Sequence, residues 1–373
     1  MALVLNEEQQ MLRDSAKTFI QESSPVSTLR ELRDKGEEWS PELWAGMAEM
    51  GWTGITIPEE YGGLEFGYVG AGLIVEECGR TLASSPLMSS SLICASLVAA
   101  LGTDAQKQSL LPAIAAGQTI MTLAVSETDR FDPLQIALTA ESDADKFILN
   151  GVKAHVLDAG IANVFIVAAT TGAPDSVSLF VVDRDAEGIQ IMPTLNADNR
   201  LTATVTFKSV RADSGALLGE AGAAGKQLQR ALDIGAVLSA AELLGLAQEA
   251  FERTLDYLKE RKQFGVPVGS FQALQHRAAQ LFSELELCKS VVLKALQAID
   301  ENASERSLLA SMAKAKMAKT AQLAVNEAVQ MFGGIGMTDE FDIGFFMKRA
   351  ASARQEYGDY YYHSDRFAKL SGY

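Results

Sequence analysis

The sequence is poor in cysteine, histidine and aromatic residues. Its three cysteines, Cys78, Cys94 and Cys288, show no spacing typical of a metal site or of a disulfide framework. The three histidines form no H-x-x-x-H pair, so no zinc site is predicted, and His363 is expected at the surface. So few cysteines favour a reducing compartment, and we expect a cytoplasmic protein.

An excess of positive charge is also missing, because the formal net charge is -16. This charge argues against nucleic acid and against anionic membrane surfaces as partners, although a local arginine can still hold a small anionic ligand. No stretch of the sequence approaches the ~18–20 apolar residues that a membrane span needs, so none is predicted. The N-terminus becomes polar within residues 1–9, so no signal peptide is expected.

Alanine and leucine are abundant. The chain has 373 residues, of which 48% are hydrophobic, 21% charged and 7% aromatic. This composition is typical of a globular, helix-rich protein with a large core. The length favours two or three domains over one.

The first third of the chain has helical patterns. Asn6 is a predicted N-cap, and Ser40 followed by Pro41 predicts the start of another helix. Apolar residues with helical spacing predict further helices at 69–80 and within 86–116.

The pattern changes near Thr119 to short β-branched or alternating segments separated by Gly, Asp, Asn and Pro. Such segments predict a small antiparallel β domain. The pair Asn150-Gly151 predicts a hairpin with a type I′ turn. The predicted strands lie at 119–125, 146–149, 164–168, 178–182 and 201–207.

Helical patterns return from about residue 225 and predict a C-terminal four-helix bundle. The predicted fold is therefore a multi-domain α+β fold with an N-terminal all-α domain, a central antiparallel β domain and the bundle. The predicted bundle helices span 228–260, 271–298, 304–332 and 343–358, and the predicted domains span 1–118, 119–212 and 213–373.

Four segments together resemble the acyl-CoA dehydrogenase family of flavoproteins, whose domain order is also helical, β and helical. They occur in the family's order and spacing and are spread over essentially the whole chain. The segments read Ile-Pro-Glu-Glu-Tyr-Gly-Gly at 57–63, Leu-Asn-Gly-Val-Lys at 149–153, Arg-Lys-Gln-Phe-Gly at 261–265 with Phe-Gln-Ala-Leu-Gln at 271–275, and Gln-Met-Phe-Gly-Gly-Ile-Gly at 330–336.

The resemblance implies FAD as cofactor, with the last two segments contacting the adenosine diphosphate part of an FAD held mainly by a neighbouring subunit. Arginine offers a planar fork of donors that suits a diphosphate, and paired glycines let a backbone approach a ligand closely. The residues implied in this role are Arg261, Phe264, Gln272, Gln330, Phe332, Gly333 and Gly334.

The catalytic base of the family is not matched. Most members carry a glutamate in a Tyr-Glu-Gly-Thr stretch near the C-terminus, and here Tyr357 takes that position. Glu356 and Asp359 are the carboxylates beside it and are our candidates for a shifted base, although ordinary ion pairs would also explain them. The alternative base position of other members falls on Gly235, with Asp233 as the nearest carboxylate.

The flavin-side loop also departs from the family pattern. Members usually read Thr/Ser-Glu-Pro-Gly-x-Gly-Ser-Asp, whereas residues 126–133 read Ser-Glu-Thr-Asp-Arg-Phe-Asp-Pro and lack both glycines. The family's Trp-Ile-Thr triplet becomes His155, Val156 and Leu157, and Leu157 has no side-chain donor for the flavin. The chain thus keeps the residues implied at the adenosine end and lacks those implied at the flavin ring.

One arrangement explains both observations. Some bacterial members are heteromeric, and residues 337–340 with 344–349 resemble those of their smaller partner subunits. We therefore predict the non-catalytic, adenosine-side subunit of a heterotetrameric acyl-CoA dehydrogenase that acts on an acyl-CoA in fatty acid, steroid or dicarboxylate catabolism. An electron-transfer flavoprotein is the partner that the resemblance implies.

Two alternatives stay open. The first is an active homotetrameric dehydrogenase that uses Glu356 or Asp359 as its base. The second is a flavin-dependent oxidase or monooxygenase on the same fold, which the alanine at 236, in place of a family arginine, slightly favours.

Overall fold

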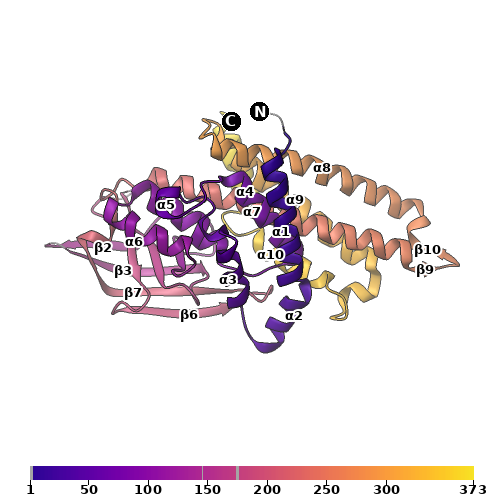
Figure 1. The fold of residues 1–373 in the computed structure, drawn as a ribbon, viewed down its shortest axis with the longest axis horizontal. Coiled ribbons are helices and arrows are strands. Elements are labelled where there is room, and N and C mark those ends of the chain that lie inside the picture. The colour runs from indigo at the N-terminus through magenta and orange to yellow at the C-terminus, as the bar shows by residue number, and fades with distance from the viewer. Residues whose placement is uncertain (1–2, 145, 174–175) are drawn as a thin grey trace. The chain divides into compact units, whose positions relative to one another are not determined.

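The computed structural model describes residues 3–144, 146–173 and 176–373 (Figure 1). The chain forms two compact units. The first, which is helical, comprises residues 1–37, 68–84 and 236–373, and the second, which contains the sheet, comprises residues 38–67 and 85–235.

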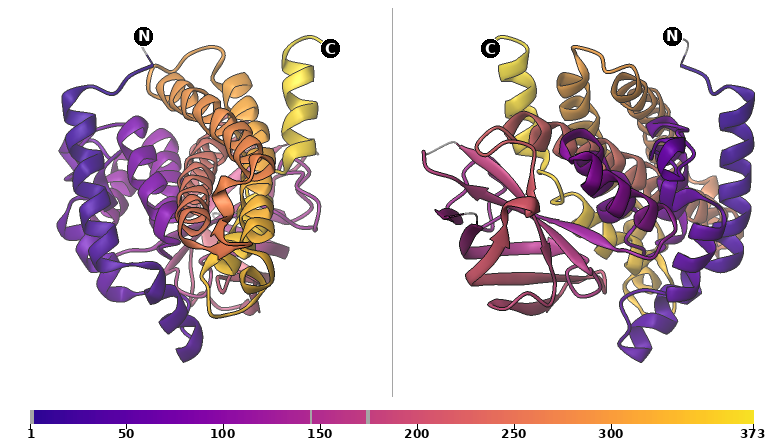
Figure 2. Two further views of the ribbon diagram at one scale, coloured as in Figure 1. Left: turned by 90° about the vertical axis from the view of Figure 1, so that its right-hand side faces the viewer. Right: turned by 60° about the vertical axis from the view of Figure 1, so that its left-hand side comes forward.

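Long helices make up the first unit, and Figures 1 and 2 show the later part of α7 with α8 and α9 running alongside one another. The predicted helical bundle is confirmed. The elements are α1 (Glu7–Ser23), α2 (Val26–Lys35), α4 (Tyr68–Thr81), α7 (Gly225–Glu260), β9 (Lys262–Gln263), β10 (Val266–Pro267), η5 (Val268–Ser270), α8 (Gln272–Asp300), α9 (Arg306–Phe332), η6 (Gly333–Met337), α10 (Ile343–Ala353) and α11 (Tyr360–Leu370).

Two helix boundaries are informative. The predicted cap at Asn6 is confirmed, since its side chain accepts a hydrogen bond from the Gln9 N–H (2.8 Å) and the Gln9 side chain accepts one from the Asn6 N–H (3.1 Å). The predicted helix at 343–358 is too long, because α10 ends at Ala353. The residues between α10 and α11 form a turn, and this turn carries the candidate bases.

The second unit combines short helices with a sheet. The predicted start of a helix at Ser40 is confirmed, because its hydroxyl accepts the Leu43 N–H (3.1 Å). The helical elements are α3 (Pro41–Glu49), η1 (Trp52–Gly54), η2 (Glu59–Tyr61), η3 (Leu87–Cys94), α5 (Ala95–Leu101), α6 (Asp104–Ala115) and η4 (Ser214–Ala216). The strands are β1 (Met121–Ala124), β2 (Thr139–Asp143), β3 (Lys146–Leu157), β4 (Val164–Thr170), β5 (Val177–Asp183), β6 (Ile189–Leu195), β7 (Leu201–Asp213) and β8 (Leu217–Leu218).

The sheet is rich in antiparallel pairs, as predicted. Its strands follow the order β6-β7-β3-β2-β4-β5-β8, and β1 adds to β4. The β1–β4 pairing is parallel, so the sheet is mixed rather than purely antiparallel. Its inner strand β4 is apolar along nearly its whole length, which buries it within the unit.

The hairpin predicted at Asn150-Gly151 is wrong. Strand β3 runs straight through both residues, and its pairing with β7 shifts register between Leu149 and Gly151. The Asn150 side chain accepts the Ser209 N–H (2.8 Å), and Gly151 has φ +150°. The Asn-Gly pair therefore lies at a β-bulge. The backbone freedom of glycine, which would suit a hairpin turn, here serves the bulge inside a strand.

One stretch passes the length and composition test for a membrane span, contrary to our reading of the sequence. It lies in α7, where an 18-residue window has a mean hydropathy of 1.4. All of that window is buried inside the structure, as in the core helix of a globular protein. A buried apolar helix of this kind is weak evidence for a membrane.

Candidate functional site

The connection between α7 and α8 presents exposed side chains. The β9–β10 hairpin projects beyond the ends of these helices (Figure 1). Phe264 at its tip is 92% exposed, has φ +55°, and lies edge-on to Phe271 at a centroid distance of 6.1 Å. A left-handed backbone under an exposed aromatic side chain is unfavourable for a free chain and suggests a functional constraint.

The predicted polar residues of this region are exposed as well. Within the described part of the chain, the side chains of Arg261, Gln272 and Gln330 make no hydrogen bond or ion pair, so their donors are available to a ligand.

The end of α9 lies beside the end of α7. The Tyr257 and Phe332 rings stack at 4.3 Å, and the Tyr257 hydroxyl donates to the Phe332 carbonyl (3.2 Å). Arg261 follows one turn after Tyr257, and Gly333 follows Phe332 directly. Phe332 itself is buried in the core, so its side chain positions the segment rather than facing solvent.

The two glycines after Phe332 form an open turn. Gly333 adopts φ +68° and ψ -146°, a conformation that suits glycine alone. A Cβ placed on Gly333 or Gly334 would meet no atom within 4 Å. The backbone here is therefore uncovered and can be approached closely, which fits the adenosine end of FAD as the resemblance implies.

Glu356, the first candidate base, is bound in an ion-pair chain. Arg349 donates to the Glu356 carboxylate with two nitrogens (2.7 and 3.1 Å) and to the Glu242 carboxylate with two more contacts (2.9 and 2.7 Å). The Arg349 and Glu242 side chains are each 3% exposed and that of Glu356 is 13% exposed. Glu356 is therefore paired with a positively charged side chain, that of Arg349, which belongs to the framework of the fold.

Asp359, the second candidate, caps a helix. Its carboxylate accepts the Tyr362 N–H (2.8 Å) at the start of α11. Between the two carboxylates, Tyr357 has φ +56°, and its carbonyl accepts a hydrogen bond from the Nε2 of His363 (2.8 Å). The structure thus brings the candidate carboxylates onto one turn and gives each of them a local structural contact.

His363 lies inside the protein, which corrects the expectation of a surface position. It is 1% exposed, and burial lowers its pKa to about 3. A carbonyl only accepts, so Nε2 carries the proton that bonds Tyr357, and Nδ1 faces the Ser311 hydroxyl at 3.4 Å. The imidazole is therefore a neutral part of the framework of the turn.

A buried lysine holds the other end of this turn. Lys314 Nζ donates to the Ser239 hydroxyl and to the Ala353 carbonyl, both at 2.6 Å. The side chain has no exposed surface, and burial lowers its pKa to about 7.

Sequence reasoning missed Glu242, Lys314 and Arg349, although two of them left a signal. Glu242 is the one charge within the apolar run 234–247, and Lys314 stands among the alanines of a helical face that is otherwise small and apolar. A charged residue on such a face predicts a buried partner.

The loop predicted at the flavin side, residues 126–133, is bound to its own unit. The Glu127 carboxylate accepts hydrogen bonds from the N–H groups of Ala137 (2.7 Å) and Leu138 (2.9 Å) and from the Nζ of Lys153 (2.7 Å). Lys153 is fully buried, and burial lowers its pKa to about 8. These three donors are thus occupied by Glu127, a residue of the loop itself.

The neighbouring strand completes this picture. His155 lies 2.9 Å from the Asp129 carboxylate on the exposed side of the unit, and the Leu157 carbonyl accepts the Thr122 hydroxyl (2.6 Å). Asp233, near the alternative base position, is buried and accepts a hydrogen bond from Gln229 (3.2 Å). Leu157, at the position that the resemblance implies for the flavin, thus has no side-chain donor, and its carbonyl is already bonded.

Three family models match the chain in order along the sequence. They are the acyl-CoA dehydrogenase N-terminal domain at residues 6–118, the middle domain at 122–210 and the C-terminal domain at 224–365. The predicted domain boundaries themselves stay a prediction.

Individual proteins are similar over nearly the full length. The probable acyl-CoA dehydrogenase YngJ of Bacillus subtilis is 32% identical over 358 residues, 93% of each chain. The structure of an acyl-CoA dehydrogenase from Geobacillus kaustophilus has a TM-score of 0.93 at 26% identity and covers 100% of both chains. That of the Tcur3481-Tcur3483 steroid ACAD has a TM-score of 0.88 at 30% identity and covers 98% of both chains.

Proposed function

The chain belongs to the acyl-CoA dehydrogenase family, with FAD as its cofactor, and from this premise we propose that it is the non-catalytic, adenosine-side subunit of a heteromeric enzyme. The enzyme would introduce an α,β double bond into an acyl-CoA thioester. The base that removes the α proton would then belong to the partner subunit.

One observation carries this proposal, namely the buried chain Glu242–Arg349–Glu356. A base must be free to take a proton and must gain basicity in a dry pocket. Arg349 instead holds both carboxylate oxygens of Glu356 in fixed hydrogen bonds. Tyr357, at the expected base position, has no carboxylate to accept the proton.

The open end of the bundle would serve the cofactor. The chemistry that FAD supplies when bound is acceptance of the hydride from the β carbon of the substrate. Arg261 would bind the diphosphate with its planar fork, and Gln272 and Gln330 would orient the adenosine by directional hydrogen bonds. Gly333 and Gly334 would let the backbone approach the ligand without a side chain between them.

The assembly would pair this chain with a homologous catalytic subunit. The name of one similar structure, the Tcur3481-Tcur3483 steroid ACAD, joins two designations, which supports a paired arrangement for this chain too. An acyl-CoA would bind mainly at the partner, and an electron-transfer flavoprotein would reoxidise the flavin, as the family resemblance implies. The assembly would be a heterotetramer.

Substitution of the two candidate bases tests the proposal. In the purified assembly, Glu356→Gln and Asp359→Asn should leave the rate of flavin reduction by an acyl-CoA within about threefold of wild type, because neither group moves a proton in the reaction. Stopped-flow absorbance under anaerobic conditions measures this rate, and thermal unfolding reports any loss of fold.

Glu340→Gln, which removes an exposed charge of the same type, is the matched control. A fall of about 10²–10⁴-fold for either candidate, in a variant that still folds and binds FAD, would instead identify that residue as the base. The enzyme would then be active in its own right.

A further inference from the structure

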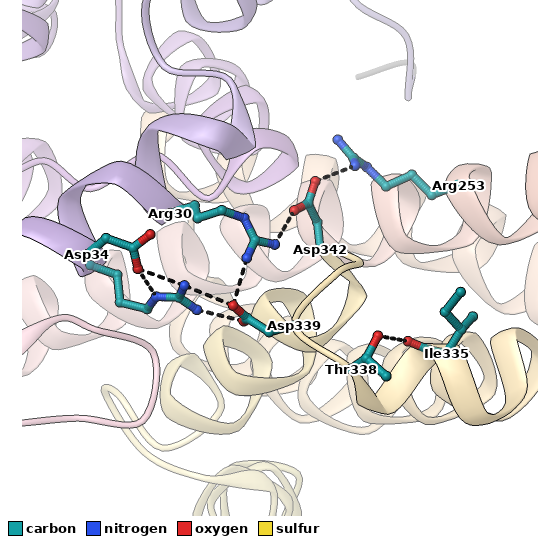
Figure 3. A network of polar contacts seen from close by, with 8 residues as sticks. Arg30, Asp34, Arg253, Ile335, Thr338, Asp339 and Asp342 are labelled. Atoms are coloured by element: carbon teal, nitrogen blue, oxygen red, sulfur yellow. Dashed lines mark hydrogen bonds and ion pairs between the residues drawn. The ribbon is translucent and has the colours of Figure 1, made fainter.

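Five charged residues form a network that we call the arginine clamp: Arg30, Arg33, Arg253, Asp339 and Asp342. Figure 3 labels four of them, Arg30, Arg253, Asp339 and Asp342. The Arg33 guanidinium bonds both oxygens of Asp339, at 2.7 and 3.0 Å. Arg30 divides its nitrogens between Asp339 (2.9 Å) and Asp342 (3.0 Å). Arg253 adds a contact to Asp342 at 3.2 Å.

The clamp grips the chain directly after the open glycine turn. Helix η6 ends at Met337, and Thr338 closes it by donating its N–H (3.1 Å) and its hydroxyl (2.8 Å) to the Ile335 carbonyl. Asp339 is the next residue, and Figure 3 shows it facing the guanidinium of Arg30. The turn is thus fixed at one end by the Tyr257–Phe332 stack and at the other end by the clamp.

The arginines are themselves oriented by their surroundings. The guanidinium carbons of Arg30 and Arg33 lie 4.8 and 5.1 Å from the centroid of the Phe345 ring. Arg33 also donates from Nε to Asp34 (2.9 Å). Hydrogen bonds from Arg33, and the charge of both arginines, lower the pKa of Asp339, which keeps this carboxylate ionised.

The exposed position of Asp339 in the clamp indicates a role other than stabilising the core. The Asp339 side chain is 64% exposed and that of Arg33 is 27% exposed. Exposed pairs contribute little to global folding, because water and salt screen them. They can still stabilise one conformation of a short segment. Without them, the glycines of that segment would allow it many conformations.

We propose that Asp339 is a positioning residue for the cofactor: held by Arg30 and Arg33, it fixes the Gly333–Met337 turn in the open conformation that receives the adenosine end of FAD. This inference rests on the function proposed above for the turn. Pre-ordering a binding segment lowers the entropic cost of binding, so FAD affinity would depend on the clamp through the conformation of the turn. Because the pairs of Asp339 are exposed, this dependence weakens as salt rises.

The test uses the full chain co-expressed and purified with its homologous subunit. The dissociation constant of FAD is measured by fluorescence titration of the FAD-stripped assembly at low salt and at about 1 M salt, where screening is nearly complete. Asp339→Asn should weaken FAD binding about tenfold at low salt and show a flatter salt dependence than wild type. Asp339→Glu should recover most of the loss, and Glu340→Gln, the neighbouring carboxylate outside the clamp, should bind within about twofold of wild type.

A second variant, Gly334→Val, distinguishes the positioning role of Asp339 from the function proposed for the turn, because the valine side chain fills the open side of the turn. If Gly334→Val loses FAD while a folded and assembled Asp339→Asn binds it as wild type does, the positioning role is wrong and the function proposed for the turn stands. If Gly334→Val retains wild-type FAD affinity, the proposed function of the turn fails, and the inference fails with it. Loss in both variants, with recovery in Asp339→Glu, supports the positioning role.

Discussion

Two turns of the helical unit differ in what their polar groups do. The Gly333–Met337 turn is open at Gly333 and Gly334, where an added Cβ would meet no atom within 4 Å. In the turn between α10 and α11, Glu356 binds Arg349, Asp359 caps a helix, and the Tyr357 carbonyl bonds His363. The first turn has its groups available to a ligand, whereas the second uses its groups to hold the fold together.

This difference separates ligand binding from framework within one bundle. A carboxylate at a catalytic position is useful only if its lone pairs are not committed to a fixed cation. The contacts of Glu356 and Asp359 therefore give each carboxylate at that turn a role in holding the fold. Variants that disturb one turn and leave the other intact test whether the two turns have these different roles.

The largest effect is expected at Arg349. Arg349→Met would leave the buried Glu242 carboxylate without its cation, and an unpaired buried charge costs about 3–5 kcal/mol. The free energy of unfolding, measured by urea denaturation, should fall by about that amount. Lys259→Met, which removes an exposed pair with Asp256, should change it by less than about 1 kcal/mol. Equal losses in the two variants would show that the Arg349 network is not a framework element.

An intermediate effect is expected from His363 at acid pH. Burial lowers its pKa to about 3 in the folded chain, whereas an unfolded histidine titrates near ~6.5. Between these values the unfolded chain binds the extra proton, so the stability present above pH ~6.5 is lost as pH falls toward 3, at up to about 1.4 kcal/mol per pH unit. His363→Gln retains a donor for Tyr357 and should show a shallower loss of melting temperature on acidification. A slope identical to wild type would mean that this histidine does not titrate as described.

The smallest effect on stability is expected at the open end. Phe264 is almost fully exposed and has a left-handed backbone, which asparagine tolerates better than phenylalanine. Phe264→Asn should therefore keep the free energy of unfolding within about 0.5 kcal/mol of wild type. It should still cost about 0.5–1.5 kcal/mol of FAD affinity in the assembly, because an aromatic contact is removed. Unchanged affinity would remove Phe264 from the cofactor surface.

Much of the fold could be predicted from local patterns. Caps at Asn6 and Ser40 and the apolar stripes of the bundle helices are local signals, and the structure confirms them. The Asn150-Gly151 pair shows the limit, because its preference for unusual backbone angles suits a bulge as well as a hairpin turn. Which of the two forms depends on the strand that pairs with it, and this is a long-range contact.

The candidate site was less predictable. Exposure of Arg261 and the open backbone at Gly334 agree with the roles that the resemblance implies, although those roles stay a prediction. The partner of Glu356 could not be read from spacing, because Glu242 lies more than a hundred residues earlier and joins it only through Arg349. Burial of His363 was missed because its polar neighbours in sequence suggest a surface, whereas α9 covers it in the fold.

The FAD content of the purified chain tests the central claim most directly. The chain is expressed alone and together with its homologous dehydrogenase subunit, and flavin absorbance is compared with protein concentration. The account predicts a colourless chain alone and about one FAD per pair of subunits in the complex, bleached on addition of an acyl-CoA. About one FAD per subunit in the lone chain, reduced by an acyl-CoA, would contradict it and would mean that this chain holds its own flavin and its own base.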